Sequence, residues 1–154
     1  MTDLDKRITA PDSAVFDVTR ESVRRFALAT GLPASEHHDV AAARLAGYPD
    51  LLAPPYFFVS LGLSMGQERP RSELSAGGIA VDDPLAPFRI VAGETTVEWL
   101  GSIFAGDVIE VTRSFISMER KTGRSGPFAL YMFRREYSRD GNLLVRETYG
   151  RLAR

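Results

Sequence analysis

The longest apolar run of the sequence lies between Tyr56 and Met65 and follows two prolines, Pro54 and Pro55. Prolines suit the first turn of a helix, where the missing N–H would have no intrahelical acceptor. A helix that is apolar nearly all round must be covered on several sides, and this run is shorter than the roughly 20 residues that span a bilayer. The pattern predicts a central helix, without an exposed face, wrapped by a sheet.

A second helix is predicted between Thr19 and Thr30, with Thr19 as its N-cap. Four side chains recur at the i, i+3, i+4, i+7 spacing of one buried helix face. They are Val23, Phe26, Ala27 and Thr30. Gly31 follows, and a glycine commonly ends a helix at this position.

The segments around this helix are shorter. Residues 1–12 are polar and aperiodic, so we expect a flexible arm there, followed by a strand over Ala14–Val18. Asp39–Ala46 has the pattern of a short helix ended by Gly47. The side chains expected to pack are Val40, Ala43 and Leu45.

The C-terminal half of the chain is rich in the β-branched and aromatic residues that favour strands. Four strands are predicted, over Phe88–Trp99, Val108–Met118, Phe128–Tyr137 and Leu143–Leu152. The Asp140–Gly141 pair favours a type I′ hairpin turn, and residues 119–127 are predicted as a polar turn. Helices followed by an antiparallel meander predict an α+β domain over residues 13–154, with a helix on one face of the sheet.

The stretch 67–87 is polar and irregular. Loops of this length are uncommon in compact domains and often have a function, so it is a candidate lid or contact arm. The alternative is a surface excursion without a role.

Composition narrows the class of protein. The 154 residues are 44% hydrophobic, enough for one domain with its own core. The formal charge of -1 provides no concentrated basic surface, so neither nucleic acid nor a membrane is expected as a partner. The sequence has no cysteine, which excludes disulfides, thiol catalysis and thiolate metal sites. Because no early apolar segment resembles a signal peptide, we expect a cytoplasmic protein.

The residues able to carry chemistry gather just before the apolar run, where His37 and His38 precede Asp39. A carboxylate that orients an imidazole is the recurrent arrangement of a general base, so His37 and Asp39 are candidate catalytic residues, with Glu36 as a substitute for Asp39. The alternative is that Asp39 caps the next helix and the histidines are surface loop residues. Two adjacent histidines without further ligands predict no metal site.

Several segments together carry a family resemblance. TGLPASEHHDVAAARLAGYPDLLAPPYFF, which contains Ala53, Pro54 and Pro55, resembles the MaoC-like hydratase and dehydratase branch of the hotdog superfamily. It is most similar to the dehydratase-like N-terminal half of double-hotdog proteins, whose central helix often follows an Ala-Pro-Pro sequence. The VTRESVRRFALATG helix, the strand ending in VEW, the AGDVIEV segment and the last hairpin add to the resemblance. It implies a single hotdog domain with a long antiparallel sheet around a central helix, and no organic cofactor.

Hydratases of this family carry a loop of the form Gly, Asp, any, Asn, Pro, any, His, in which the Asp and the His activate water and move a proton. With His37 as the last residue, the glycine falls on Gly31. The aspartate, asparagine and proline positions fall on Leu32, Ala34 and Ser35. The resemblance therefore implies a site that keeps Gly31 and His37 but lacks the carboxylate of the motif.

In catalytic members of the family, an N–H at the start of the central helix stabilises the negative charge on the thioester oxygen. Pro54 and Pro55 have no N–H, so the amides of Tyr56 and Phe57 are the candidate donors to a bound substrate. The Tyr56 hydroxyl is a further candidate, and the alternative is a core aromatic with its hydroxyl near the surface.

The resemblance implies a lyase of fatty acid or polyketide metabolism, which adds or removes water at a C=C bond of an acyl-CoA or acyl carrier protein thioester. The alternative is a catalytically silent hotdog subunit that binds the acyl chain and pairs with an active partner. A thioesterase with Asp50 as its base is a third hypothesis. Hotdog domains pair through edge strands, so we expect a homodimer or a heterodimer with another hotdog chain. Arg120, Lys121 and Arg124 are candidate contacts for phosphates or an acidic carrier protein, or else form a solvated turn.

Overall fold

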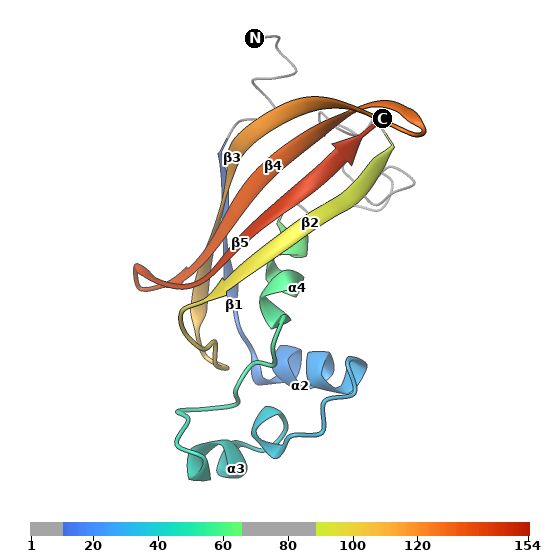
Figure 1. Cartoon of the computed structure of the whole chain (residues 1–154). Coiled ribbons are helices and arrows are strands. Elements are labelled where there is room, and N and C mark those ends of the chain that lie inside the picture. Colours follow the sequence, from blue (N-terminus) through green and yellow to red (C-terminus); the bar gives the residue numbers. More distant parts are fainter. Residues whose placement is uncertain (1–10, 66–88) are drawn as a thin grey trace, which may run out of the picture.

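The computed structural model describes residues 11–65 and 89–154, and it contains one antiparallel sheet of five strands in the order β1-β3-β4-β5-β2. The strands are β1 (Asp12–Asp17), β2 (Ile90–Trp99), β3 (Val108–Gly123), β4 (Gly126–Arg139) and β5 (Asn142–Ala153). The sheet curls around one helix, as the sequence predicts (Figure 1). This confirms the predicted α+β architecture.

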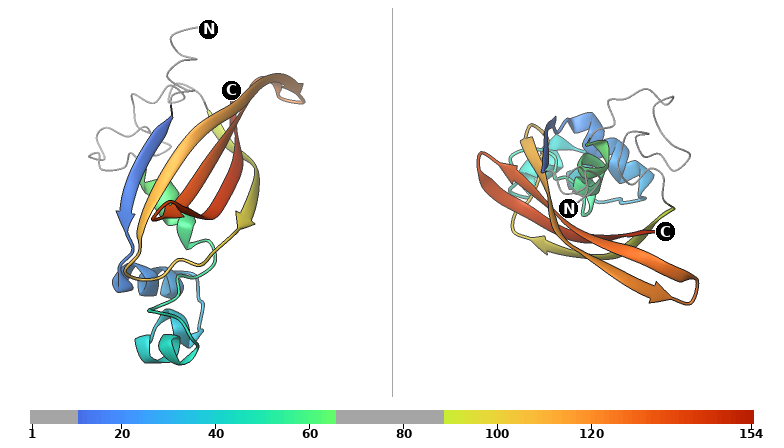
Figure 2. Two further views of the ribbon diagram at one scale, coloured as in Figure 1. Left: turned by 90° about the vertical axis from the view of Figure 1, so that its left-hand side faces the viewer. Right: turned by 90° about the horizontal axis from the view of Figure 1, so that it is seen from above.

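The helices lie on one side of this sheet, as the view from above shows (Figure 2). They are α2 (Arg20–Ala29), α3 (Val40–Leu45) and α4 (Phe57–Ser64), with a 3-10 turn, η1 (Ser35–His37), between α2 and α3. α4 is cradled by the sheet, whereas α2 and α3 lie beyond the N-terminal end of α4 (Figure 1). Within the described residues, no helix is long and apolar enough to cross a membrane.

The predicted ends of α2 are confirmed. The Thr19 hydroxyl accepts from the Ser22 N–H at 3.0 Å, and the Ser22 hydroxyl accepts from the Thr19 N–H at 3.1 Å, which forms a reciprocal capping box. Val23 and Ala27 are buried as predicted, but Thr30 is exposed. Thr30 is the C-cap of α2, and both its N–H and its hydroxyl donate to the Phe26 carbonyl, at 3.0 and 2.7 Å.

The short helix α3 is also confirmed, with one correction. Ala43 is buried, but Leu45 is 92% exposed although it was predicted to pack. A helix of six residues covers fewer than two turns, so its apolar spacing does not define a buried face by itself.

The central helix differs from the prediction at its start. Pro54 and Pro55 precede the helix and do not occupy its first turn, because Tyr56 adopts the left-handed conformation with φ of 65°. The expectation of a helix without an exposed face is also wrong, since Leu63 is 51% exposed. The helix turns one side to the sheet, and that side carries the buried residues Phe57, Phe58, Leu61 and Gly62.

The strands confirm the predicted meander, and the last hairpin has Asp140 and Gly141 at φ of 50° and 76°, as a type I′ turn requires. The polar turn predicted over residues 119–127 is wrong in extent. β3 continues to Gly123 and β4 begins at Gly126, so only two residues form the turn. The resulting two-stranded ribbon projects from one end of the sheet (Figure 1).

The main core lies between α4 and the sheet. It unites Phe57, Phe58 and Leu61 of α4 with Ile109, Val111, Tyr137 and Val145 of the sheet, and with Val23 of α2. A second cluster of buried residues comprises Tyr131, Phe133, Tyr149 and Ala153. The predicted arm and the predicted 67–87 loop lie largely or wholly outside the described residues, and β1 begins at Asp12, the last residue assigned to the arm.

Candidate functional site

His37 is buried at the end of η1, with 6% of its surface exposed. Its Nδ1 lies 2.8 Å from the carbonyl oxygen of Leu52. A carbonyl oxygen only accepts hydrogen bonds, so Nδ1 carries the proton and, in the neutral ring, Nε2 keeps the lone pair. The ring is therefore held in the tautomer that leaves Nε2 as the proton acceptor.

Two further backbone bonds hold the residues around His37. The Leu52 N–H donates to the Glu36 carbonyl at 3.0 Å, so Leu52 is bonded to η1 through both its N–H and its carbonyl. The Ala53 N–H donates to the Ile103 carbonyl at 2.9 Å, on the other side of the segment. The loop that carries His37 is thus tied to the residues that lead into α4.

Asp39, the predicted partner of His37, is the N-cap of α3. Its Oδ1 accepts hydrogen bonds from the N–H groups of Ala41 and Ala42, at 2.6 and 3.1 Å. Within residues 11–65 and 89–154, no hydrogen bond joins Asp39 to His37. The structure therefore places Asp39 where the capping alternative expects it, and does not bring the candidate pair into contact.

His38 points to a different acceptor from His37. Its Nε2 lies 2.8 Å from the Leu32 carbonyl, and its own carbonyl accepts from Arg24 Nε at 2.8 Å. The two imidazole centroids are 6.5 Å apart. Among the described residues, no group of three or more His, Asp or Glu side chains is arranged to hold a metal ion.

Gly31 shapes the start of this loop. It has φ of 68°, and its N–H donates to the Leu28 carbonyl at 3.2 Å while the Leu32 N–H donates to the Ala27 carbonyl at 2.9 Å. A Cβ at this position would meet no atom within 4 Å, so the backbone conformation is what favours glycine. Gly31 thus ends α2, as predicted from the sequence, and turns the chain toward His37.

Tyr56 and Phe57, which together with Gly31 were predicted to bind substrate, differ in their surroundings at the start of α4. The Phe57 N–H donates to the Pro54 carbonyl at 3.0 Å, so one of the two candidate amide donors is already engaged. The Phe57 ring is buried and packs edge-on against Phe26, with centroids 5.6 Å apart. Tyr56 is 55% exposed. Phe57 therefore belongs to the core, and Tyr56 to the accessible surface of the site.

An apolar pocket of about 410 Å³ lies beside the start of α4. Its walls come from the segment before α4, from α4 itself, from the residues at and after the end of β2, and from Val145 of β5. They include Leu52, Pro54, Tyr56, Phe58, Trp99 and Ile103. His37 is not among the lining residues and is connected to the pocket through the Leu52 carbonyl.

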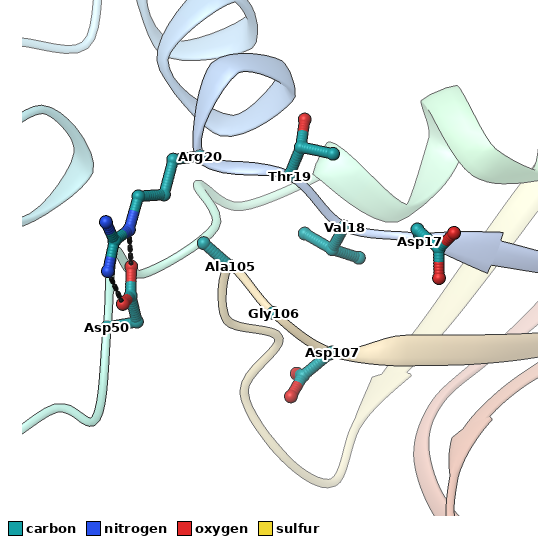
Figure 3. A pocket seen from close by; sticks show the side chains of 8 residues that line it. All are labelled: Asp17, Val18, Thr19, Arg20, Asp50, Ala105, Gly106 and Asp107. Carbon is teal, nitrogen blue, oxygen red and sulfur yellow. Dashed lines mark hydrogen bonds and ion pairs between the residues drawn. The ribbon is translucent and has the colours of Figure 1, made fainter.

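A polar pocket of about 440 Å³ lies between the start of α2 and the turn before β3 (Figure 3). Arg20 spans it with a bidentate ion pair, from Nε to Asp50 Oδ1 at 2.9 Å and from its second nitrogen to Oδ2 at 2.6 Å. The hydrogen bond from Arg20 lowers the pKa of Asp50 to about 2. A carboxylate held in this way is a poor proton acceptor near neutral pH, so the geometry gives the thioesterase hypothesis no base at Asp50.

Arg135, Tyr137 and Glu147 form a buried polar cluster that was not predicted from the sequence. Arg135 and Tyr137 both contact Oε2 of Glu147, with Arg135 Nη1 at 3.4 Å and the Tyr137 hydroxyl at 3.1 Å. Burial, and then the Glu147 charge, raise the pKa of Tyr137, which keeps its proton. Arg135 Nε is buried and has no hydrogen-bond partner in the described part of the chain. The sequence signal that could have indicated this cluster is Arg135 itself, a charged residue that alternates with Phe133 and Tyr137 on the core-facing side of β4.

The basic residues Arg120, Lys121 and Arg124 lie at the projecting β3–β4 hairpin, and all three are exposed. Across the sheet, Arg120 of β3 pairs with Ala129 of β4, which pairs with Ala153 of β5, and Ala153 pairs with Ile90 at the start of β2. The apolar pocket lies at Trp99, the other end of β2, about 30 Å away along the strand. These residues are therefore not part of the same site.

Comparisons with known proteins agree with this fold. The family model described as FAS1-like, dehydratase domain region matches residues 9–147. A UPF0336 protein of Streptomyces coelicolor is 30% identical over 116 residues, which cover 73% of this chain and 70% of that protein.

Two solved structures show the same fold at low sequence identity. The HadBC (3R-hydroxyacyl-ACP dehydratase) complex of Mycobacterium tuberculosis matches with a TM-score of 0.71 and 21% identity, over 98% of each chain. A MaoC-like dehydratase from Rhodospirillum rubrum matches with a TM-score of 0.66 and 17% identity, over 95% of this chain and 91% of the other. The chain belongs to the FAS1-like dehydratase-region family and has the hotdog fold of MaoC-like dehydratases, which confirms the resemblance found in the sequence.

Proposed function

We propose that this chain is the acyl-binding subunit of a two-chain hotdog hydratase or dehydratase. In such an enzyme, the second hotdog chain supplies the residues that add or remove water at the C=C bond of an acyl thioester. One observation carries the proposal. His37 has no carboxylate partner in the described part of the chain.

The chemistry explains why that absence matters. Removing water from a 3-hydroxyacyl thioester requires one group to take the proton next to the carbonyl and another to protonate the leaving hydroxyl. Here Leu32 stands at the motif's aspartate position, Asp39 caps α3, and Asp50 is paired with Arg20. His37 alone provides one proton-transfer group where the reaction needs two.

The start of α4 supports the same conclusion. Negative charge that develops on the thioester oxygen needs N–H donors aimed at it. Pro54 and Pro55 offer none and the Phe57 N–H is bonded to the Pro54 carbonyl, which leaves the Tyr56 N–H as the remaining candidate donor at this helix start. A partner chain with a complete helix start would provide the missing donors.

The edge of the sheet offers a surface for such a partner. β2 is an edge strand of ten residues, longer than the other edge strand, β1, and Val91 and Trp99 on it are exposed. A long edge of this kind is a template for pairing with another strand. Continuation of the sheet into a second hotdog domain would cover β2 and leave α2 and α3 free.

A self-sufficient lyase with His37 as its proton carrier is the second candidate. The observation in its favour is the His37 tautomer, because the Leu52 carbonyl leaves Nε2 unprotonated in the neutral ring. In this case Glu36 or Asp39 would have to move to supply the second group.

The two candidates are separated by assaying crotonyl and longer enoyl thioesters with the purified chain alone and with a co-purifying hotdog chain. We expect the chain alone to be inert, the complex to be active, and His37→Ala in this chain to leave the activity of the complex within about twofold. His38→Ala is the matched control for local disturbance. Turnover by the isolated chain that His37→Ala abolishes and His38→Ala retains would establish the lyase instead.

A further inference from the structure

We propose that Arg113, Arg135 and Arg151 form a second binding site, which takes the carboxylate of a small organic acid whose remaining part is apolar. The three residues belong to β3, β4 and β5, which lie side by side in the sheet (Figure 1). The site is remote from the pocket at Trp99, because Trp99 pairs with Val145 and Arg151 follows Val145 on β5 at a distance of about 20 Å. It does not depend on the proposed function of the chain.

The three arginines gather around one pair of aromatic rings. Arg135 and Arg151 both lie against the Tyr149 ring, with their Cζ atoms 4.5 and 4.7 Å from its centroid. The Cζ atom of Arg113 lies 5.7 Å from the centroid of Phe133, and the Phe133 and Tyr149 rings are stacked with centroids 5.6 Å apart. Arg113 is also directly opposite Arg135 in the pairing of β3 with β4. Three guanidinium groups from adjacent strands therefore share one small region of the sheet.

Arg135 is the buried member of this group, with 8% of its surface exposed. It lies on the side of the sheet that carries α4, because a Cβ on Gly62 would be 3.0 Å from its Nη1. Nη1 lies 3.4 Å from Oε2 of Glu147, but Nε has no hydrogen-bond partner in the described part of the chain. Buried N–H groups are nearly always bonded, so this donor indicates a place for an acceptor oxygen.

The charges of the site select the kind of anion. Glu147 offsets Arg135, and Asp12 lies 3.9 Å from Arg113. No ion pair joins Arg151 to a carboxylate of the described residues. Three guanidinium groups and two carboxylates leave a net charge of +1, which one further carboxylate balances and a phosphate dianion exceeds. The planar fork of a guanidinium also matches the two oxygens of a carboxylate.

Arg151 and Arg113 are partly exposed, so a ligand can reach them from solvent. Burial, with the charge of Arg135 acting in the same direction, lowers the pKa of Arg151. A bound anion would offset both effects, because it would replace lost hydration and reduce the repulsion between the two cations.

The surroundings of the three arginines are otherwise apolar. Besides the Phe133 and Tyr149 rings, they comprise Ile90, Phe115, Ala129, Tyr131 and Ala153. An acid with one carboxylate and an apolar body fits this arrangement, since the charged end meets the arginines and the body removes apolar surface from water. A second charge on the ligand would lose its hydration without gaining a counter-ion.

Calorimetric titration of the whole chain tests this choice with three ligands of one chain length, which are octanoate, 1-octanol and octyl phosphate. Octanoate is expected to bind saturably and at least about tenfold more tightly than 1-octanol, because the alcohol cannot form the charge-assisted hydrogen bonds. Octyl phosphate is expected to bind more weakly than octanoate, because its second negative charge has no counter-ion.

Three variants locate the binding. Arg151→Met removes the charge but keeps a long side chain, so octanoate should bind about tenfold more weakly, and Arg113→Met should weaken it in the same direction. Arg134→Met is the matched control, because Arg134 is exposed and, as the neighbour of Arg135 on β4, points to the other face of the sheet. Circular dichroism checks that each variant is folded, and Arg113→Met decides if Arg151→Met is not.

Weaker octanoate binding in Arg151→Met and Arg113→Met, with Arg134→Met unchanged, would establish the site. Equal affinities for octanoate and 1-octanol, or equal losses in all three variants, would overturn it in favour of a nonspecific apolar surface. Octanoate binding that is unchanged in folded Arg151→Met would place the ligand elsewhere and would overturn it as well. Tighter binding of octyl phosphate than of octanoate would reject the carboxylate.

Discussion

Polar side chains lie near α4 at two places, and they are satisfied in different ways. Near the start of the helix, His37 bonds a backbone carbonyl and keeps Nε2 without a partner among the described residues. Under the middle of the helix, Arg135 and Tyr137 bond Glu147 in a cluster that is closed to solvent. In the first region an imidazole nitrogen near an apolar pocket is left without a hydrogen-bond partner among the described residues. In the second region the buried polar groups bond one another, apart from Arg135 Nε.

The difference shows which buried polar groups are candidates for chemistry. A buried ion pair is no evidence of function, and it need not add stability over an apolar replacement. The cluster does limit the distance between α4 and the sheet, because α4 approaches the Arg135, Tyr137 and Glu147 side chains at Gly62. A Cβ on Gly62 would overlap the Tyr137 hydroxyl and lie 3.0 Å from Arg135 Nη1. The cluster therefore sets how closely α4 packs, whereas the His37 ring keeps Nε2 without a partner among the described residues.

The largest predicted effect comes from breaking the buried pair. Glu147→Leu leaves the Arg135 guanidinium in the core without its carboxylate, which should lower the free energy of unfolding by about 3–5 kcal/mol. Urea unfolding followed by circular dichroism measures the change. The double variant Arg135→Met with Glu147→Leu removes both charges and should recover most of the loss.

Glu136 provides the matched control for this prediction. It is the neighbour of Arg135 on β4, points to the other face of the sheet and bonds Arg146 Nε at 2.8 Å. Because that pair is open to solvent, Glu136→Leu should change the stability far less than Glu147→Leu. Equal losses for the two variants would mean that the cluster is solvated and that the contrast between the two regions is false.

The second effect concerns the contact at Gly62. Gly62→Ala should cost about 1–3 kcal/mol, because the new methyl group overlaps the Tyr137 hydroxyl and α4 must shift. Thermal unfolding of Gly62→Ala, Tyr137→Phe and the double variant tests this in a mutant cycle. If the overlap is the cause, Gly62→Ala costs less in the Tyr137→Phe background. Additive losses would assign the effect to the contact of the new methyl group with Arg135 instead, because alanine favours the helix backbone over glycine.

The sequence predicted elements whose signals are local. Thr19 and Gly31 mark the ends of α2 through a hydroxyl cap and a positive φ, and Asp140–Gly141 marks a hairpin for the same kind of reason. The β3–β4 ribbon was missed because both of its faces are exposed near its tip, so Lys121 and its neighbours show no alternation.

The site was harder to predict than the fold. The resemblance drew attention to His37, but its partner is a backbone carbonyl 15 residues away, and a carbonyl leaves no trace in the identity of Leu52. Arg135 was overlooked because charged residues are almost never buried unless they are paired, and its pairing with Glu147 depends on the strand register. The bonding partners of His37 and of Arg135 both lie far away along the chain, so neither partner could be identified from the local sequence.

The smallest predicted effect separates the two roles of Asp39. If Asp39 only caps α3, Asp39→Ala should lower the stability by about 1 kcal/mol, while Asp39→Ser, which keeps an acceptor oxygen, should lose much less. Neither variant should then alter the turnover of the proposed two-chain enzyme by more than the loss of folded protein explains. A carboxylate that works with His37 would behave differently, because serine can replace the cap but cannot accept the proton. Normal stability with lost turnover in Asp39→Ser would therefore place Asp39 beside His37 in the reaction, and would move the chemistry from the partner chain to this one.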